Sequence, residues 1–263
     1  MKNRAERLRA VLDLLGESGS VEIGDIVSRL GVSVATARRD LDALATEQLL
    51  TRTRGGASAR SVAYDLPLRY KREHNAAQKQ AIARAASALV PVGAVVGLTG
   101  GTTSTGVAAA LAVRTDIAQR APQHGLTIVT NAVNIAAELA VRPQIRTVVT
   151  GGVVQSRSYE LVGPYSDEVL GQITMDLAFI GVNGVDPAFG VTVHDEREAA
   201  VNALMARRAE RAILIADSSK IGRRAFATVG LLSDFTTLIT DDGITQGDRA
   251  AFESAGIEVV VAS

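Results

Sequence analysis

Apolar side chains recur at helical spacing in the first thirty residues of the chain. Positions i, i+3, i+4 and i+7, which form one face of a helix, are apolar in two successive stretches. The two sets are Leu8, Val11, Leu12 and Leu15, then Ile23, Ile26, Val27 and Leu30. The small residues Gly16, Ser18, Gly19 and Ser20 end the first stretch, and Gly31 ends the second. The pattern predicts two short amphipathic helices.

A third helix is predicted to begin at Ser33, whose hydroxyl can accept a hydrogen bond from an unpaired N–H at the helix start. Its inward positions hold Ala37, Leu41 and Leu44, and the opposite face holds Ala35, Arg39 and Asp42, flanked by Thr36 and Arg38. A tight turn followed by a helix with an outward Thr/Arg face is typical of a major-groove reader, in which arginine contacts guanine or phosphate. We therefore expect a helix-turn-helix at about 20–39.

A basic hairpin is predicted next, at about 48–57. Residues 49–54 alternate roughly as a strand does, and Gly55-Gly56 makes a turn, so that Arg52 and Arg54 share one face. Short amphipathic helices also occur in protein-binding modules, but the ordered set of helices, cap and hairpin favours a winged helix-turn-helix DNA-binding domain, of α+β class, at 1–58. The candidate DNA-binding residues are Ser33, Ala35, Thr36, Arg38, Arg39, Arg52 and Arg54.

Beyond a linker expected at 59–75, short apolar runs alternate with helical stretches. Several runs are β-branched and apolar on both faces, as buried parallel strands are. The runs are 94–98, 127–130, 146–150, 177–181, 212–216, 237–240 and 258–262, and helices are predicted at 78–90 and 107–111. The alternation predicts an α/β domain at 76–263 with helices on both faces of a mostly parallel sheet.

Nearly every predicted strand is followed by glycine, hydroxyl, amide or charged residues. In open α/β sheets, ligands bind beyond the carboxyl ends of the strands. Residues 99–104 read Thr-Gly-Gly-Thr-Thr-Ser before a helix, which predicts a phosphate-binding loop, because glycines expose backbone N–H groups and the helix N-terminus is positive. This loop is neither a Walker loop nor a dinucleotide fingerprint.

Other strand ends supply the remaining candidates for an effector site. Lys220 can place a positive charge on a phosphate, and Asn131, Asn183 and Glu198 can bind sugar hydroxyls. The candidate effector-binding residues are Gly100, Gly101, Thr102, Thr103, Ser104, Asn131, Gly151, Gly152, Asn183, Glu198 and Lys220. We expect no catalytic residue, no metal and no cofactor, and the lone His194 is assigned no role.

Composition limits the class of protein without identifying it. The 263 residues exceed the usual ~100–200 of a single domain, and 47% hydrophobic with 3% aromatic residues predicts a core of Ala, Val, Leu and Ile. Net charge is zero, so a DNA-binding interpretation depends on where the charges lie. There is no Cys, no signal-peptide pattern and no bilayer-length apolar run, so we expect a cytoplasmic protein without membrane contact.

The motifs resemble those of a known family. Residues 36–41 (Thr-Ala-Arg-Arg-Asp-Leu) and 50–57 (Leu-Thr-Arg-Thr-Arg-Gly-Gly-Ala) resemble the N-terminal signature of the DeoR family of bacterial transcriptional regulators, with Ala37 in place of the usual larger hydrophobic residue. Further blocks resemble the family's sensor domain in order along the chain. They lie at 79–83, 100–103, 129–131, 150–152, 181–184, 217–222 and 238–241.

The resemblance implies both a function and a fold. Family members are mostly repressors of sugar-use operons that respond to phosphorylated sugars, so a repressor of a carbohydrate-use operon is implied here. The C-terminal domain is expected to be ribose-phosphate-isomerase-like, with a Rossmann-like, mostly parallel sheet. The implied partners are a double-stranded DNA operator, a phosphorylated sugar and further copies of the chain, as a dimer or tetramer.

Two alternatives stay open. The C-terminal part also resembles ribose-5-phosphate isomerase, but the positions matching its carboxylates and lysine hold Ile180, Asn183 and Val193, and asparagine cannot act as a base at neutral pH. Although Asp186 and Glu198 survive, we expect a site that binds without turnover, and hence no enzyme. The second alternative is a DNA-binding protein whose C-terminal domain only oligomerises, which would show no response to phosphosugars.

Overall fold

The computed structural model describes residues 4–18, 20–46, 49–58, 75–119 and 125–263. The chain divides into two compact units, Met1–Leu66 and Pro67–Ser263. The expected linker at 59–75 lies outside the described residues, apart from Asn75.

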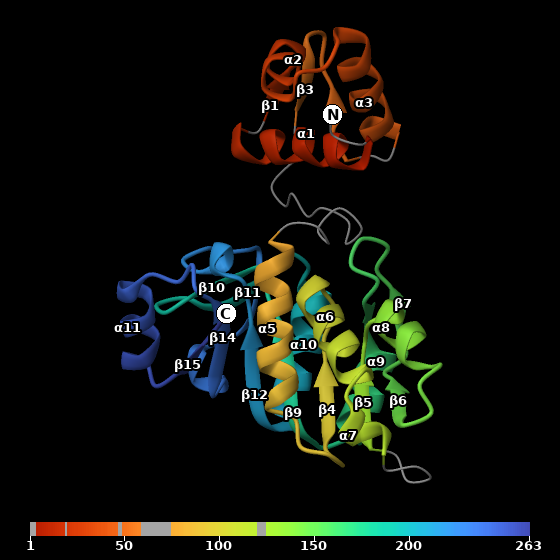
Figure 1. The fold of residues 1–263 in the computed structure, drawn as a ribbon, viewed down its shortest axis with the longest axis vertical. Coiled ribbons are helices and arrows are strands. Elements are labelled where there is room, and N and C mark those ends of the chain that lie inside the picture. The colour runs from red at the N-terminus through yellow and green to blue at the C-terminus, as the bar shows by residue number, and fades with distance from the viewer. Residues whose placement is uncertain (1–3, 19, 47–48, 59–74, 120–124) are drawn as a thin grey trace. The chain divides into compact units, whose positions relative to one another are not determined.

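The described part of the N-terminal unit contains the three predicted helices and a small antiparallel sheet (Figure 1). Its elements are α1 (Arg4–Ser18), β1 (Ser20–Glu22), α2 (Ile23–Leu30), α3 (Val34–Thr46), β2 (Thr51–Arg52) and β3 (Gly56–Ser58). The apolar stripes meet in one core. Its buried members include Leu8, Val11, Leu12, Leu15, Ile26, Ala37, Leu41 and Leu44.

The predicted hairpin needs correction. The strand β2 spans only Thr51–Arg52, because Leu49 and Leu50 are both buried and do not alternate. Gly56 does not belong to the turn. It begins β3, which pairs with both β1 and β2, and a Cβ on Gly56 would come within 1.9 Å of the Val21 carbonyl oxygen. The small sheet therefore depends on a glycine at this position.

An ion pair joins the first helix to the third. Arg7 Nε and Nη2 donate to Asp40 Oδ2 and Oδ1 at 2.9 and 3.1 Å, and Asp40 is buried. Two parallel hydrogen bonds give this pair a defined geometry. It holds α1 against the inner side of α3, opposite the outward Arg residues.

Seven parallel strands form the main sheet in the described part of the C-terminal unit. They are β4 (Val95–Leu98), β5 (Leu126–Thr130), β6 (Ile145–Val149), β9 (Met175–Gly181), β12 (Ala209–Ile215), β14 (Thr237–Asp241) and β15 (Glu258–Ala262). The order is β15-β14-β12-β9-β4-β5-β6, and every neighbouring pair is parallel. Each run predicted as a strand is one, so the predicted α/β class is confirmed.

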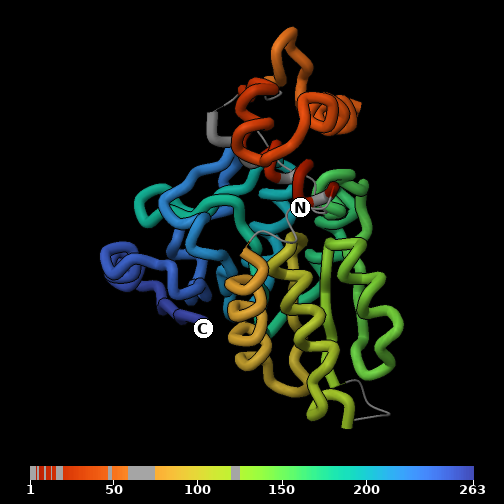
Figure 2. The backbone as a smooth tube through the Cα atoms, turned by 45° about the horizontal axis from the view of Figure 1, so that its top comes forward, coloured from red at the N-terminus to blue at the C-terminus, as the bar shows by residue number. Residues whose placement is uncertain are grey.

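Helices cover both faces of this sheet (Figures 1 and 2). One face carries α5 (Ala76–Ala88), α6 (Thr102–Ala112), α7 (Thr115–Ala118) and α8 (Val133–Leu139), and the other carries α9 (Pro164–Gly171), α10 (Glu196–Arg207) and α11 (Gln246–Ser254). Alternate residues of one strand enter the two cores: Ile213 and Ile215 the first, Ala212 and Leu214 the second. A doubly covered parallel strand is therefore apolar on both sides.

The start of α6 differs from the predicted helix at 107–111. The helix begins at Thr102, so Thr102, Thr103 and Ser104 form its first turn and are not loop residues. The Thr-rich start and Gly106 have low helix propensity, and this concealed the true boundary.

Smaller elements surround the carboxyl ends of the main strands, and the apolar pattern did not predict them. They are the hairpin β7 (Val153–Val154) with β8 (Leu161–Val162), the sheet of β10 (Gly184–Asp186), β11 (Gly190–Val193) and β13 (Ala227–Gly230), and the 3₁₀ helices η1 (Ser218–Lys220) and η2 (Leu232–Asp234). Pro187 follows β10 in a turn. Across the described ranges, no helix is long and apolar enough to cross a membrane.

Candidate functional site

The turn between α2 and α3 has the geometry that its sequence predicts. Gly31 ends α2 at a φ of 65°, in the left-handed region that favours glycine, and its N–H donates to the Val27 carbonyl at 3.0 Å. Ser33 Oγ then accepts a hydrogen bond from the backbone N–H of Thr36 at 3.2 Å. The predicted N-cap is confirmed, and it sets the direction in which α3 leaves the turn.

The outward face of α3 is exposed. Ala35, Arg38 and Arg39 are all open to solvent, and Thr36 is half-buried. The Nε of Arg39 donates to the Ala35 carbonyl at 3.3 Å, which lays its side chain along the helix. The structure thus brings two guanidinium groups and a hydroxyl onto the first two turns of one exposed helix face.

The two hairpin arginines differ from each other. Arg52 Nε donates to Asp42 Oδ1 at 2.9 Å, and its guanidinium also donates to the Gly56 carbonyl. Arg54 is exposed in the bend that follows β2. They do not form the shared exposed face that the alternation predicted, because Arg52 joins the hairpin to α3.

In the C-terminal unit, the order of the strands indicates a binding edge. From β4 the chain continues to β5 and β6 on one side, and later strands add to the other side, beginning with β9. Ligands in such sheets bind beyond the carboxyl ends at this reversal, which lies between β4 and β9. The 99–104 segment follows β4 directly, so it lies at the reversal point.

Hydrogen bonds within the 99–104 segment fix its shape. Thr99 Oγ1 accepts from the Gly181 N–H at 2.9 Å, and Ser104 Oγ donates to the Gly100 carbonyl at 3.2 Å. Gly101 caps α6 at a φ of 115°, a conformation that favours glycine. The N–H groups of the first turn of a helix have no partner inside that helix and favour an anion. Ser104 and Thr99 therefore shape the loop, and Thr102 and Thr103 stand at the helix start.

A buried carboxylate borders this loop on the side of β5. Asn131, fully buried at the end of β5, donates from Nδ2 to Glu160 Oε2 at 3.0 Å. A Cβ added to Gly100 would lie 2.3 Å from Glu160 Cγ and 2.5 Å from its Oε1. Gly100 is glycine because Glu160 occupies the space that a side chain would need.

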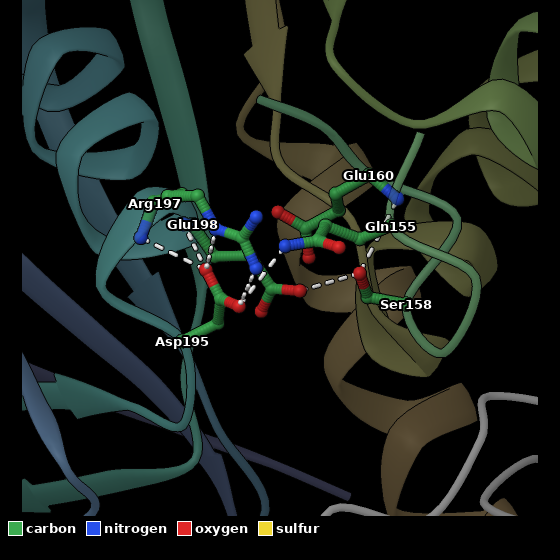
Figure 3. A network of polar contacts seen from close by, with 6 residues as sticks. All are labelled: Gln155, Ser158, Glu160, Asp195, Arg197 and Glu198. Carbon is green, nitrogen blue, oxygen red and sulfur yellow. Dashed lines mark hydrogen bonds and ion pairs between the residues drawn. The ribbon is translucent and has the colours of Figure 1, made fainter. Parts of the chain in front are cut away.

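Glu160 belongs to a polar network that reaches the start of α10 (Figure 3). Ser158 Oγ donates to Glu198 Oε1 at 2.5 Å and accepts from the Glu160 N–H at 3.3 Å. Asp195 caps α10 by accepting from the N–H of Glu198, and Gln155 Nε2 donates to Asp195 Oδ2 at 3.0 Å. Through the Ser158 hydroxyl, the network joins the backbone of Glu160 to the carboxylate of Glu198.

The loop after β12 carries two charged residues, Asp217 and Lys220. Asp217 is buried and accepts hydrogen bonds from Ser219 and from Asn75 Nδ2, the latter at 2.9 Å. Burial alone would raise the pKa of Asp217, but the hydrogen bonds from Ser219 and Asn75 and the positive charges of Lys220 and Lys79 lower it below its usual value. An ionised Asp217 thus holds the start of α5 against the loop that carries Lys220.

Lys79 opens the 79–83 sequence block but was not among the candidate effector-binding residues. It is buried, 8% exposed, and it lines a groove of about 740 Å³ between α5 and α6 together with Thr102. Its signal was available: it shares the inward helix face of Ala83 and Ala86, where a lysine is unusual. Glu160 and Ser158 were also missed, and they lie in an irregular connection without periodicity.

Other predicted residues have structural roles. Gly151 and Gly152 adopt φ values of 73° and 124° after β6, and a Cβ on Gly152 would lie 2.5 Å from Ser166 Oγ. Asn183 Oδ1 accepts from the His194 backbone N–H at 3.2 Å. The described residues hold no cluster of three or more His, Cys, Asp or Glu side chains able to bind a metal ion.

Two family models match this chain. The DeoR-like helix-turn-helix domain matches residues 7–62, and the DeoR C terminal sensor domain matches residues 74–242. The chain is 34% identical to HTH-type transcriptional regulator GlpR of Haloferax volcanii over 258 residues, covering 97% of each. It is 28% identical to the glycerol-3-phosphate regulon repressor of Escherichia coli K12 over 238 residues, covering 90% of this chain and 91% of the relative.

Solved structures show more distant likenesses. Ribose 5-phosphate isomerase A from Methanocaldococcus jannaschii matches with a TM-score of 0.41 at 19% identity, over 56% of this chain and 55% of that one. The full-length sorbitol operon regulator SorC from Klebsiella pneumoniae matches with a TM-score of 0.37 at 13% identity, over 84% and 91%. At these scores the likenesses carry no further argument.

Proposed function

Because this chain belongs to the DeoR family of transcriptional regulators, we propose that it represses a carbohydrate-use operon and that a phosphorylated sugar controls its affinity for the operator. The observation that carries the proposal is the 99–104 segment, a glycine- and threonine-rich helix start at the reversal point of a parallel sheet. Glycerol 3-phosphate, after which the regulon repressed by one relative is named, is a phosphorylated polyol.

The DNA contacts are assigned to the N-terminal unit. Thr36, Arg38 and Arg39 are proposed to contact the major groove or its phosphates, with Ala35 close to the base edges and Ser33 near the backbone. Arg54 is proposed to contact the backbone or minor groove from the hairpin. Arg52 contributes through its bonds to Asp42 and Gly56, which hold the hairpin against α3.

The effector contacts are assigned to the carboxyl edge of the sheet. The N–H groups and hydroxyls at the start of α6 are proposed to bind the phosphate, with Lys220 as a point charge and Lys79 close by. Asn131, Asn183 and Glu198 are proposed to meet the sugar hydroxyls. The remaining proposed residues of this edge are Gly100, Gly101, Thr102, Thr103, Ser104, Gly151 and Gly152.

Control by the effector is a linkage between two sites. The ligand shifts operator affinity only by the difference in its own affinity for the DNA-competent and DNA-incompetent states. A typical coupling of ~1–3 kcal/mol corresponds to ~5–150-fold in operator affinity. We propose that the chain acts as a homo-oligomer, a dimer or tetramer, since helix-turn-helix regulators read paired half-sites.

The test is fluorescence anisotropy with the chain's own promoter DNA at fixed salt, titrated with a panel of sugar phosphates. One compound is expected to change operator affinity at least fivefold. Arg39→Ala should abolish operator binding and leave phosphosugar binding intact, whereas Thr103→Ala or Lys220→Ala should keep DNA binding and lose the response. Tight DNA binding that ignores every phosphosugar would contradict the proposal and support a C-terminal unit that only oligomerises.

A further inference from the structure

Asn75 stands directly before α5 and uses its side chain in an unusual way. It occupies the N-cap position, where an asparagine ordinarily accepts hydrogen bonds from the N–H groups of its own helix, and it makes no such bond. Its Nδ2 instead donates to Asp217 Oδ1 at 2.9 Å and to Ser219 Oγ at 3.4 Å. Because Asp217 lies 142 positions further along the chain, this side chain joins the start of α5 to the loop after β12.

The backbone of Asn75 is held in an uncommon conformation. Its φ of 51° and ψ of 41° lie in the left-handed region, which asparagine enters more readily than most residues with a side chain. Apart from glycines, the described residues adopt a positive φ only at Asn75 and Tyr159. Such conformations persist where surrounding contacts enforce them, and they cluster in switch regions. At Asn75 the bonds to Asp217 and Ser219 supply those contacts.

The bond between Asn75 and Asp217 also relates two lysines to each other. The Asn75 carbonyl accepts from the Lys79 N–H at 2.9 Å, and the Asp217 carbonyl accepts from the Lys220 N–H at 2.9 Å. Asp217 is 1% exposed, so water cannot readily replace a donor that its carboxylate loses. This side-chain contact therefore helps to fix the first turn of α5 relative to η1.

The first turn of α5 borders the proposed phosphate site. Ala76 and Lys79 line the groove between α5 and α6 together with Thr102, the first residue of α6. A phosphate bound at the start of α6 therefore adds negative charge near Lys79. Lys79 and Lys220 are also positive charges that act on Asp217, and a bound anion competes with Asp217 for them. Phosphate binding thus weakens the electrostatic hold on Asp217 and on the loop that carries it.

The covalent path between the two units enters α5 at Asn75. The N-terminal unit ends at Leu66, and residues 67–74 lead directly to Asn75. We propose that Asn75 couples the effector site to the DNA-binding unit: its bond to Asp217 holds the start of α5 in the DNA-competent arrangement, and an effector phosphate releases it. Asn75 is then a positioning residue that contacts neither the effector nor DNA. This inference rests on the proposed function and names how the effector controls the DNA-binding unit.

Asn75→Gly tests the coupling, because glycine adopts the left-handed region without strain and only the amide is removed. The full-length variant and the wild type are compared by fluorescence anisotropy with promoter DNA. The probes are glycerol 3-phosphate, glucose 6-phosphate, ribose 5-phosphate and inorganic phosphate. Without any probe, Asn75→Gly should bind the operator at least roughly fivefold more weakly than the wild type, the lower end of a typical coupling.

The response of the variant is the second measurement. A probe that changes the operator affinity of the wild type should change that of Asn75→Gly by less than about twofold, because the bond that the probe releases is already missing. Calorimetric titration without DNA should show that the variant binds this probe at least as tightly as the wild type does. The coupling is then lost while the effector site is intact.

A matched control separates the hydrogen bond from the stiffness of the helix start. Ala77→Gly places a glycine in the exposed first turn of α5, which lowers helix propensity and leaves the Asn75 amide in place. This variant should keep the operator affinity and the response of the wild type. Hydrogen exchange follows the release itself: the active probe should speed exchange of the Lys79 N–H, which is bonded to the Asn75 carbonyl, in the wild type.

Three results would overturn the coupling role of Asn75. They are an unchanged operator affinity of Asn75→Gly without a probe, a wild-type response to the probe in that variant, and an equal loss of response in Ala77→Gly. Where a probe changes the operator affinity of the wild type, each of these results sinks this inference alone. If no sugar phosphate changes that affinity, the proposed phosphosugar control fails and this inference fails with it.

Discussion

At the scale of single residues, Gly100 shows how a side chain far away in the sequence, that of Glu160, can require a glycine. Its neighbour in space is Glu160, whose Cγ would lie 2.3 Å from an added Cβ. Glu160 cannot easily move aside, because it is buried and bonded to Asn131. The glycine is therefore required by packing.

Gly100→Ala is expected to destabilise the C-terminal unit by about 1–3 kcal/mol, the usual cost of overpacking a core. It should also weaken phosphosugar binding at least tenfold, while operator binding in the absence of effector is retained. Chemical denaturation and calorimetric titration measure the two effects.

The matched control is Gly171→Ala, at the end of α9, where an added Cβ meets no atom within 4 Å. Truncating the partner should relieve the clash, so the double variant Gly100→Ala/Glu160→Ala should lose less stability than the two single losses added together. Simple additivity would show that the glycine is not set by Glu160.

These residues also mark the limit of prediction from sequence. The 99–104 segment could be recognised because glycine, hydroxyls and a following helix are adjacent in the chain. Glu160 could not, because its partners Asn131 and Gly100 come from other strand ends, and only the folded sheet brings them together.

At the scale of elements, α10 depends on its N-cap. Asp195 Oδ1 accepts from the N–H groups of Arg197 and Glu198 at 2.8 and 3.3 Å, and Arg197 Nη2 donates to its Oδ2 at 2.9 Å. Asp195→Ala should cost about 1 kcal/mol of unfolding free energy at neutral pH, as other cap removals do. Asp195→Asn should recover much of this loss, because asparagine is an equally good cap.

The same residue predicts a dependence on pH. Burial favours the protonated form of Asp195, but the hydrogen bonds from Arg197 and from the helix N–H groups outweigh it and lower its pKa. A lowered native pKa stabilises the fold above the unfolded value of about 3.9, and this contribution is lost as pH falls through the native pKa.

Denaturation curves between about pH 5 and 2 can measure this loss. The stability difference between the wild type and Asp195→Asn should shrink as pH falls through that range. A difference that stays constant down to pH 2 would show that the carboxylate contributes no pH-linked stability.

Strands and helices could be predicted where buried positions follow a regular pattern along the sequence. The seven main strands follow from apolar runs, because a doubly covered parallel strand must be apolar on both sides. β1 was not predicted, because Ser20–Glu22 is only three residues long and lies between two helical patterns. The sheet of β10, β11 and β13 is rich in glycine and turns, so its pairing depends on contacts that no local pattern encodes.

At the scale of the whole molecule, membership of the DeoR family confirms the expectation of a transcriptional regulator and not an enzyme. If operator and phosphosugar are linked, each must change the affinity for the other by the same factor. Operator DNA should therefore shift the phosphosugar Kd by the factor that the phosphosugar shifts the operator Kd.

Calorimetric titration of the sugar with and without saturating operator measures one factor, and anisotropy measures the other. Thr103→Ala is expected to remove the effector's influence on DNA. Two clearly unequal factors in the wild-type chain would mean that a further species, such as a change of oligomeric state, takes part.

The strand order has a consequence for the timing of folding on the ribosome. β4 lies between β5 and β9, yet β9 is made much later in the chain, and β14 and β15 complete the sheet only at its very end. The N-terminal unit needs only contacts within its own short segment, and such local contacts form fastest. The nascent chain should thus acquire its helix-turn-helix before its sensor exists. Proteolysis of ribosome-bound chains that end within β9 should find the N-terminal unit protected while β4, β5 and β6 are still cleaved.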